Sequence, residues 1–137
     1  MPLSISKLIL AYCLTFMVFL AIDLVWLGFV AKDLYRRQLG SLLSQNVNWA
    51  AAIIFYLLFV AGVFLFAIAP AIEKQSLSHA ILYGALFGFF TYATYDLTNL
   101  ATLKDWPVKI VFIDIVWGMV LTGAVSTSGF YIVKWLK

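Results

Sequence analysis

The sequence predicts an all-α integral membrane protein, an up-down four-helix bundle with an amphipathic interfacial helix in the first loop. Hydrophobic residues make up 65% of the 137-residue chain and charged residues only 11%, against about 45–50% and about 25% in soluble domains. Four stretches are long enough to cross about 30 Å of hydrocarbon. Because these stretches are continuously apolar and do not alternate, they predict helices and not the strands of a membrane barrel.

The four stretches leave only short loops, so we expect one transmembrane domain over residues 1–137. The predicted spans are residues 8–31, 49–69, 79–101 and 108–133. Short connections favour antiparallel neighbours, which gives the up-down order. Residues 33–45 place Tyr35 and four leucines on one half of a helical wheel and mostly polar residues on the other. This pattern is typical of an interfacial helix; a partly ordered loop is the alternative.

The few charges exclude several classes of protein. A net charge of +3 carried by scattered residues cannot track a phosphate backbone, so we expect membrane lipid and no nucleic acid as a partner. Basic residues near membrane boundaries fit a membrane protein, but they divide four against five between the two sides. A fixed topology and a dual topology with antiparallel homodimers are therefore both open.

Three aspartates lie where acids are costly, inside the predicted spans. They are Asp23, Asp96 and Asp114, and intramembrane acids rarely face lipid. Counted from the span ends at 1.5 Å per residue, all three lie about 8–12 Å below the face of the first and third loops. Three carboxylates in one dry layer predict either a bound cation, with a metal as one possibility, or a carboxyl group that keeps its proton.

The predicted span 79–101 has one polar face. On a helical wheel, this face carries two glycines followed by polar and aromatic residues: Gly84, Gly88, Tyr92, Tyr95, Asp96, Asn99 and Thr102. The opposite arc carries Leu82, Leu86, Phe90, Ala93 and Leu97 and is expected to face lipid. Glycines four residues apart permit close approach of another helix. The polar end beyond them predicts a cavity lining, with a structural tyrosine–asparagine network as the alternative.

A short pattern occurs in both the first and the fourth span. Ile22-Asp23-Leu24-Val25-Trp26 resembles Ile113-Asp114-Ile115-Val116-Trp117. Asp and Trp three residues apart share a helix face, so an indole N–H can reach a carboxylate. Since the two spans run in opposite directions, the repeat indicates local inverted pseudo-symmetry.

The stretch Tyr95-Asp96-Leu97-Thr98-Asn99-Leu100-Ala101-Thr102, together with the two Asp-x-x-Trp segments, carries a resemblance over essentially the whole chain. The chain resembles a family of small bacterial predicted membrane proteins of unknown function. The resemblance implies a four-helix protein of the cytoplasmic membrane. It implies no activity and assigns no catalytic residues.

Three functions remain open. The first is binding or transport of a proton, metal ion or small organic cation at the aspartate layer, with Trp26, Trp117, Tyr92, Tyr95 and Asn99 as its lining. The second is an intramembrane enzyme whose carboxylate-bound metal acts on a lipid-linked substrate. In it, the basic residues Arg36, Arg37, Lys104 and Lys109 would hold an anionic head group. The third is an accessory or assembly protein in which the acids only tie helices together.

The sequence favours binding or transport over catalysis. It contains no nucleophile motif and no phosphate loop, so we assign no catalytic residues and identify no cofactor. The expected ligand is small and cationic or apolar.

Overall fold

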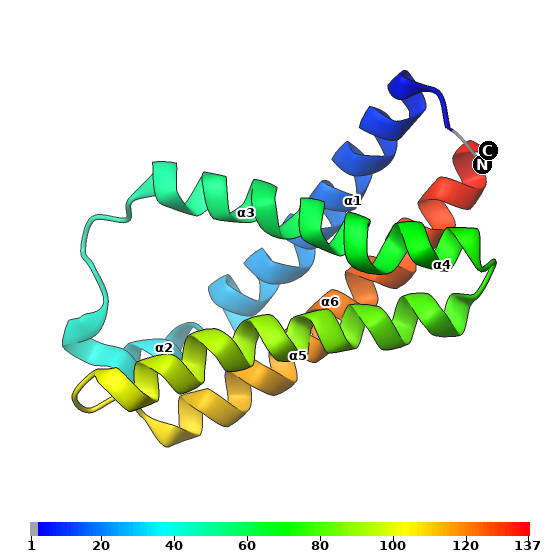
Figure 1. Cartoon of the computed structure of the whole chain (residues 1–137). Coiled ribbons are helices and arrows are strands. Elements are labelled where there is room, and N and C mark those ends of the chain that lie inside the picture. Colours follow the sequence, from blue (N-terminus) through cyan, green and yellow to red (C-terminus); the bar gives the residue numbers. More distant parts are fainter. Residues whose placement is uncertain (1–2) are drawn as a thin grey trace.

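A computed structural model describes residues 3–137 (Figure 1). Every regular element in that range is helical, which confirms the all-α prediction. Three helical segments are long and apolar enough to cross a membrane: Ile5–Val30, Trp49–Glu73 and Val108–Leu136. The predicted span 79–101 lies in a helix of similar length, α5 (Leu77–Thr102). That helix is less apolar because its last turns carry Asp96 and several threonines.

The first crossing segment consists of two helical types. Helix α1 (Ile5–Val25) begins at Ser4, whose side chain accepts a hydrogen bond from the backbone N–H of Lys7. It continues as a π-helical segment, η1 (Trp26–Val30). Such insertions are frequent at functional sites because they rotate the side chains that follow.

The first loop is only partly helical. Helix α2 (Lys32–Leu39) is amphipathic and is followed by a short 3₁₀ turn, η2 (Gly40–Leu42). The interfacial helix was predicted over residues 33–45, but the α-helix ends at Leu39 in the structure. Gly40 has a φ of 47°, a left-handed conformation that stops the helix and that glycine adopts without strain.

The second crossing segment passes through a proline. It comprises α3 (Trp49–Val63), the π-helical segment η3 (Phe64–Ile68) and α4 (Ala69–Glu73). The predicted end at residue 69 is too early. Pro70 stands in the first turn of α4, where its missing N–H breaks no hydrogen bond within α4.

Helices α5 and α6 (Val108–Leu136) lie side by side and run in opposite directions (Figure 1). The predicted close approach at the two glycines is present. A Cβ added to Gly88 would lie 2.0 Å from the carbonyl oxygen of Gly118, and one added to Gly84 would lie 2.5 Å from the Cβ of Ser126. Small residues thus set the distance between the two helices.

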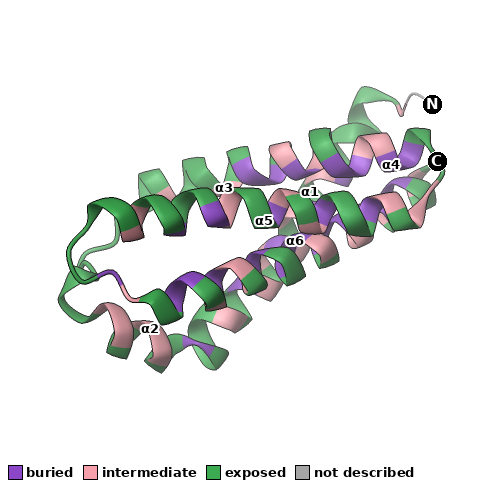
Figure 2. Cartoon of the chain, turned by 60° about the horizontal axis from the view of Figure 1, so that its bottom comes forward, coloured by how far each residue is buried: buried purple, intermediate pink, exposed green. Residues whose placement is uncertain are grey.

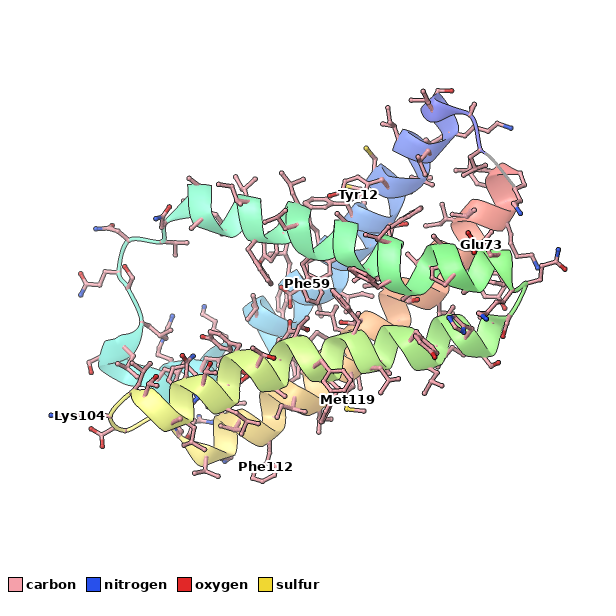
Figure 3. The ribbon with its side chains drawn as sticks, viewed as in Figure 1. Tyr12, Phe59, Glu73, Lys104, Phe112 and Met119 are labelled. Atoms are coloured by element: carbon pink, nitrogen blue, oxygen red, sulfur yellow. The ribbon has the colours of Figure 1, made fainter. Side chains whose placement is uncertain are left out.

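The buried residues face inward and the exposed ones are largely apolar (Figure 2). The main core includes Val60, Val63, Leu121 and Val125, all fully buried. Large apolar side chains such as Phe112 point outward (Figure 3). In a membrane protein this outer surface meets lipid tails, so it costs nothing to leave it uncovered by protein.

Candidate functional site

A cavity of about 450 Å³ lies where α1, η1, α2, α3, α5 and α6 meet. Seven of its lining residues belong to the set predicted from the sequence: Asp23, Trp26, Arg36, Tyr92, Tyr95, Asp114 and Trp117. Five further polar or aromatic lining residues were not predicted as part of a site: Lys32, Tyr35, Phe55, Tyr56 and Trp106. The cavity therefore extends from two of the intramembrane acids to the first loop.

Asp23 forms one acidic wall of the cavity. Its side chain is 6% exposed. Its two oxygens accept hydrogen bonds from two other helices: the indole N–H of Trp117 on α6 at 3.4 Å, and the hydroxyl of Tyr56 on α3 at 3.4 Å. Both bonds are long, and Asp23 has no basic partner in either. The carboxylate is thus held in place while it still faces the cavity.

Asp114 forms the other acidic wall and is also 6% exposed. It accepts a short hydrogen bond from the hydroxyl of Tyr35, which itself accepts one from the indole N–H of Trp26 at 3.2 Å. Burial, together with the bond to Asp114, raises the pKa of the Tyr35 phenol well above its usual value. Tyr35 therefore stays protonated and fixes α2 over the cavity as a hydrogen-bond donor.

The two Asp-x-x-Trp segments meet face to face. The rings of Trp26 and Trp117 stack with their centroids 4.3 Å apart and their planes 9° from parallel. Each tryptophan is linked by hydrogen bonds to the aspartate of the other segment. Trp117 donates directly to Asp23, whereas Trp26 donates to the hydroxyl of Tyr35, which donates to Asp114. The predicted bond within one helix is replaced by a bond across the two, as the inverted repeat allows.

A π-helical turn connects Trp26 to the loop helix α2. Trp26 is the first residue of η1, directly after the regular part of α1. The wider turn changes the direction of the chain ahead of α2, and the N–H of Ala31 bonds back to the carbonyl of Trp26 at 2.8 Å. A local irregularity of the helix therefore brings α2 and Tyr35 over the acids.

Asp96 lies behind the cavity wall and is fully buried. Neither of its oxygens has a hydrogen-bond donor, and the nearby indole N–H of Trp106 also has no partner. The carboxyl of Asp96 lies beside that of Asp114. A protonated Asp96 can donate its O–H to Asp114, which satisfies both groups. Two carboxyl groups that lie side by side can share one proton.

The three aspartates do not cluster at one point. Among residues 3–137, no three acidic, histidine or cysteine side chains gather closely enough to hold a metal ion. Asp96 lies beside Asp114, whereas Asp23 is bonded to groups on α3 and α6. The three-aspartate metal site expected from the sequence stays a prediction.

The predicted basic contacts divide into two groups. Arg36 lines the cavity together with Lys32, and both are exposed on α2. Arg37, Lys104 and Lys109 are not among the lining residues; Lys104 points away from the protein (Figure 3). Asn99 also lies outside the lining. The end of the cavity at α2 is therefore basic, and the walls formed by α1 and α6 are acidic.

Tyrosines complete the aromatic wall. Tyr92 contacts Phe59 edge-on, with ring centroids 6.2 Å apart, and Tyr95 contacts Trp106 edge-on at 5.8 Å. Trp106 is only 8% exposed. Ala93, expected to face lipid, is also buried, at 9% exposed.

The unpredicted tyrosines carried a weak signal in the sequence. Tyr56 is a hydroxyl in an otherwise apolar span, and Tyr35 lies on the apolar face of the interfacial helix. An apolar face can cover either lipid or the bundle. In the structure it packs on the bundle, because Leu34, Tyr35 and Leu39 contact the small core around Ile110 and Val111.

A comparison with family models agrees with this membrane architecture. Residues 8–131 match the family described as predicted membrane protein, DUF2177. No curated protein and no solved structure matches the chain. The match covers nearly the whole chain, so the protein belongs to the DUF2177 family of predicted membrane proteins.

Proposed function

We propose that the chain crosses the membrane four times in up-down order, with α5 as the third crossing. Helix α5 is 26 residues long, about 39 Å at 1.5 Å per residue, which is enough for a tilted crossing. Its less apolar face is turned toward α6 and the cavity, where Asp96 is buried. The family description supports a membrane location, and the resemblance to small bacterial membrane proteins favours the bacterial cytoplasmic membrane.

In that membrane, the protein binds a small organic cation in the cavity between the two Asp-x-x-Trp segments. The observation that carries this function is the wall itself: two buried carboxylates, Asp23 and Asp114, beside the stacked indoles of Trp26 and Trp117. Carboxylates offer charge to an ammonium group, and aromatic faces attract it through cation–π contact. A volume of about 450 Å³ suits a small molecule.

Binding of a cation is expected to release a proton. A positive charge beside Asp114 favours the ionised form of the Asp96–Asp114 pair. Protons released into weakly buffered solution on ligand addition would report this step. An Asp96→Asn variant is expected to bind the cation with no release, because the shared proton is lost.

The test of cation binding uses benzyltrimethylammonium and its neutral isostere neopentylbenzene, with the protein in nonionic detergent micelles. We expect calorimetry to show saturable binding of the cation alone. Asp23→Asn should weaken it at least tenfold, which corresponds to about 1.4 kcal/mol. The matched control is Asp33→Asn, because Asp33 is exposed on α2 outside the cavity lining.

A structural role for the acids is the second candidate, since Asp23 joins α1 to α3 and α6. In that case Asp23→Asn would change the melting temperature. Cation binding would either be absent from the wild-type protein or be the same in both proteins. Wild-type protein that shows no saturable binding of benzyltrimethylammonium would contradict the proposed function.

A further inference from the structure

The cavity continues into a second, apolar space between two helices. A cleft of about 340 Å³ between α3 and α5 is lined by Phe55, Phe59, Thr91, Tyr92 and Tyr95. Phe55, Tyr92 and Tyr95 also line the main cavity. The two spaces therefore share one wall, and a single molecule can occupy both.

The cleft opens where α3 and α5 part. The helices are in contact around η3, and toward the start of α3 they move apart (Figure 1). Phe59 extends from α3 toward α5 (Figure 3) and contacts Phe87 and Tyr92, with ring centroids 5.4 Å and 6.2 Å away. Phe59 thus forms the closed end of the cleft, and the exposed edge of Tyr95 lies at its side.

The lining of this cleft suits a hydrocarbon chain. Four of its five residues are aromatic, and the hydroxyl of Thr91 bonds to the carbonyls of Phe87 and Gly88 on its own helix at 2.8 Å and 3.2 Å. The hydroxyl hydrogen of Thr91 is then used within α5 and is not offered to a ligand. An alkyl chain gains by burial against such a surface.

The main cavity carries charges of both signs. Asp23 and Asp114 stand on its walls from α1 and α6, and Lys32 and Arg36 line it from α2. A ligand with only a positive charge leaves the basic side chains unmatched. A head group with an ammonium and a phosphate matches both sets, because arginine pairs well with phosphate oxygens and the ammonium fits the aromatic–carboxylate wall.

We propose that the organic cation is the ammonium of a zwitterionic single-chain phospholipid whose alkyl chain lies in the α3–α5 cleft. The ammonium lies between Asp23, Asp114 and the stacked indoles, and the phosphate lies at Lys32 and Arg36. The inference rests on the proposed function for the ammonium part. It adds a phosphate contact and a chain path that a small soluble cation does not need.

The chain path is tested by photocrosslinking. The probe is lysophosphatidylethanolamine with a diazirine on its alkyl chain, added to the protein in nonionic detergent micelles. We expect mass spectrometry to place the crosslinks on residues 55–59 and 91–95. Excess unlabelled lysophosphatidylethanolamine should compete at least tenfold better than lysophosphatidylglycerol, which has the same phosphate and chain but no ammonium.

Two pairs of variants locate the two parts of the ligand. Thr91→Phe fills the cleft and should reduce crosslinking at least tenfold. Thr91→Leu adds a smaller side chain at the same position and should reduce crosslinking less. Thr94→Phe, at an exposed position on the same helix, should leave crosslinking unchanged. Arg36→Gln should weaken lysophosphatidylethanolamine and should not weaken benzyltrimethylammonium, because a positive charge is removed from the lining of a cation site; Arg37→Gln, outside the lining, should alter neither.

The outcomes separate this inference from the proposed function. Crosslinks spread over outward residues such as Leu65 and Phe112, with no competition, would overturn the lipid ligand. Full crosslinking in folded Thr91→Phe protein would do the same. If benzyltrimethylammonium still binds in either case, the proposed cation site is retained and only the lipid ligand is rejected. If benzyltrimethylammonium does not bind, the proposed function is rejected as well.

Discussion

The two ends of the bundle are built differently. At the end that carries the termini, Val60, Val63, Leu121 and Val125 are fully buried, and small residues let α5 and α6 touch. We call this region the packed half. At the α2 end, the open half, the helices surround a cavity and bury three acids. Apolar packing stabilises the bundle at one end. This stability allows the buried aspartates, which cost free energy, to remain at the other end.

The largest expected effect comes from crowding the packed half. Gly88→Ala places a Cβ 2.0 Å from the carbonyl oxygen of Gly118, so the two backbones must separate. We expect the free energy of unfolding to fall by about 3 kcal/mol or more, measured by denaturant titration in detergent. Gly123→Ala is the matched control, because its nearest neighbour is 3.8 Å away. Equal stability of the two variants would show that the helix contact does not hold the bundle.

A smaller effect is expected where α2 covers the open half. Tyr35→Phe removes the bond to Asp114 and the acceptor of Trp26. Loss of a hydrogen bond to a charged group costs about 1.5–3 kcal/mol. We expect faster hydrogen exchange in residues 32–39 and at least tenfold weaker benzyltrimethylammonium binding. Tyr83→Phe serves as the control, since Tyr83 is exposed and outside the cavity lining; unchanged exchange in α2 would argue against Tyr35 as its anchor.

The smallest effect concerns the tryptophan stack that joins the two repeated segments. A double-mutant cycle with Trp26→Leu and Trp117→Leu should give a coupling energy of about 0.5–1.5 kcal/mol beyond the single losses. The near-ultraviolet circular dichroism of the stacked pair should disappear in either single variant. A coupling energy near zero would mean that the two segments meet without stabilising each other.

Much of the architecture could be predicted from the sequence. Uninterrupted apolar stretches indicate helices in lipid, and the glycine spacing at Gly84 and Gly88 indicates a close helix contact. Both signals are local, because period and residue size act within one helix. The end of α2 was misplaced, since the sequence does not state that Gly40 adopts a left-handed conformation.

The candidate site was predicted less completely. The position of Asp23, Asp96 and Asp114 inside apolar predicted spans identified them as unusual, and their distances from the span ends predicted one layer. Depth along a helix does not fix which neighbours meet, so the pairing of Asp96 with Asp114 required the structure. The contribution of Tyr35 could not be predicted because it depends on how a loop helix folds back on the bundle.

The helical structure and the membrane character of this protein could be predicted from its sequence, as could the position of three aspartates within largely apolar stretches. These properties follow from composition and from periods of a few residues, which act through solvation and local backbone geometry. The tertiary structure alone decided that Trp26 and Trp117 stack, that Tyr35 covers Asp114, and that the cavity continues into the α3–α5 cleft. Such contacts join residues as many as 94 positions apart, and only the packing of whole helices brings them together.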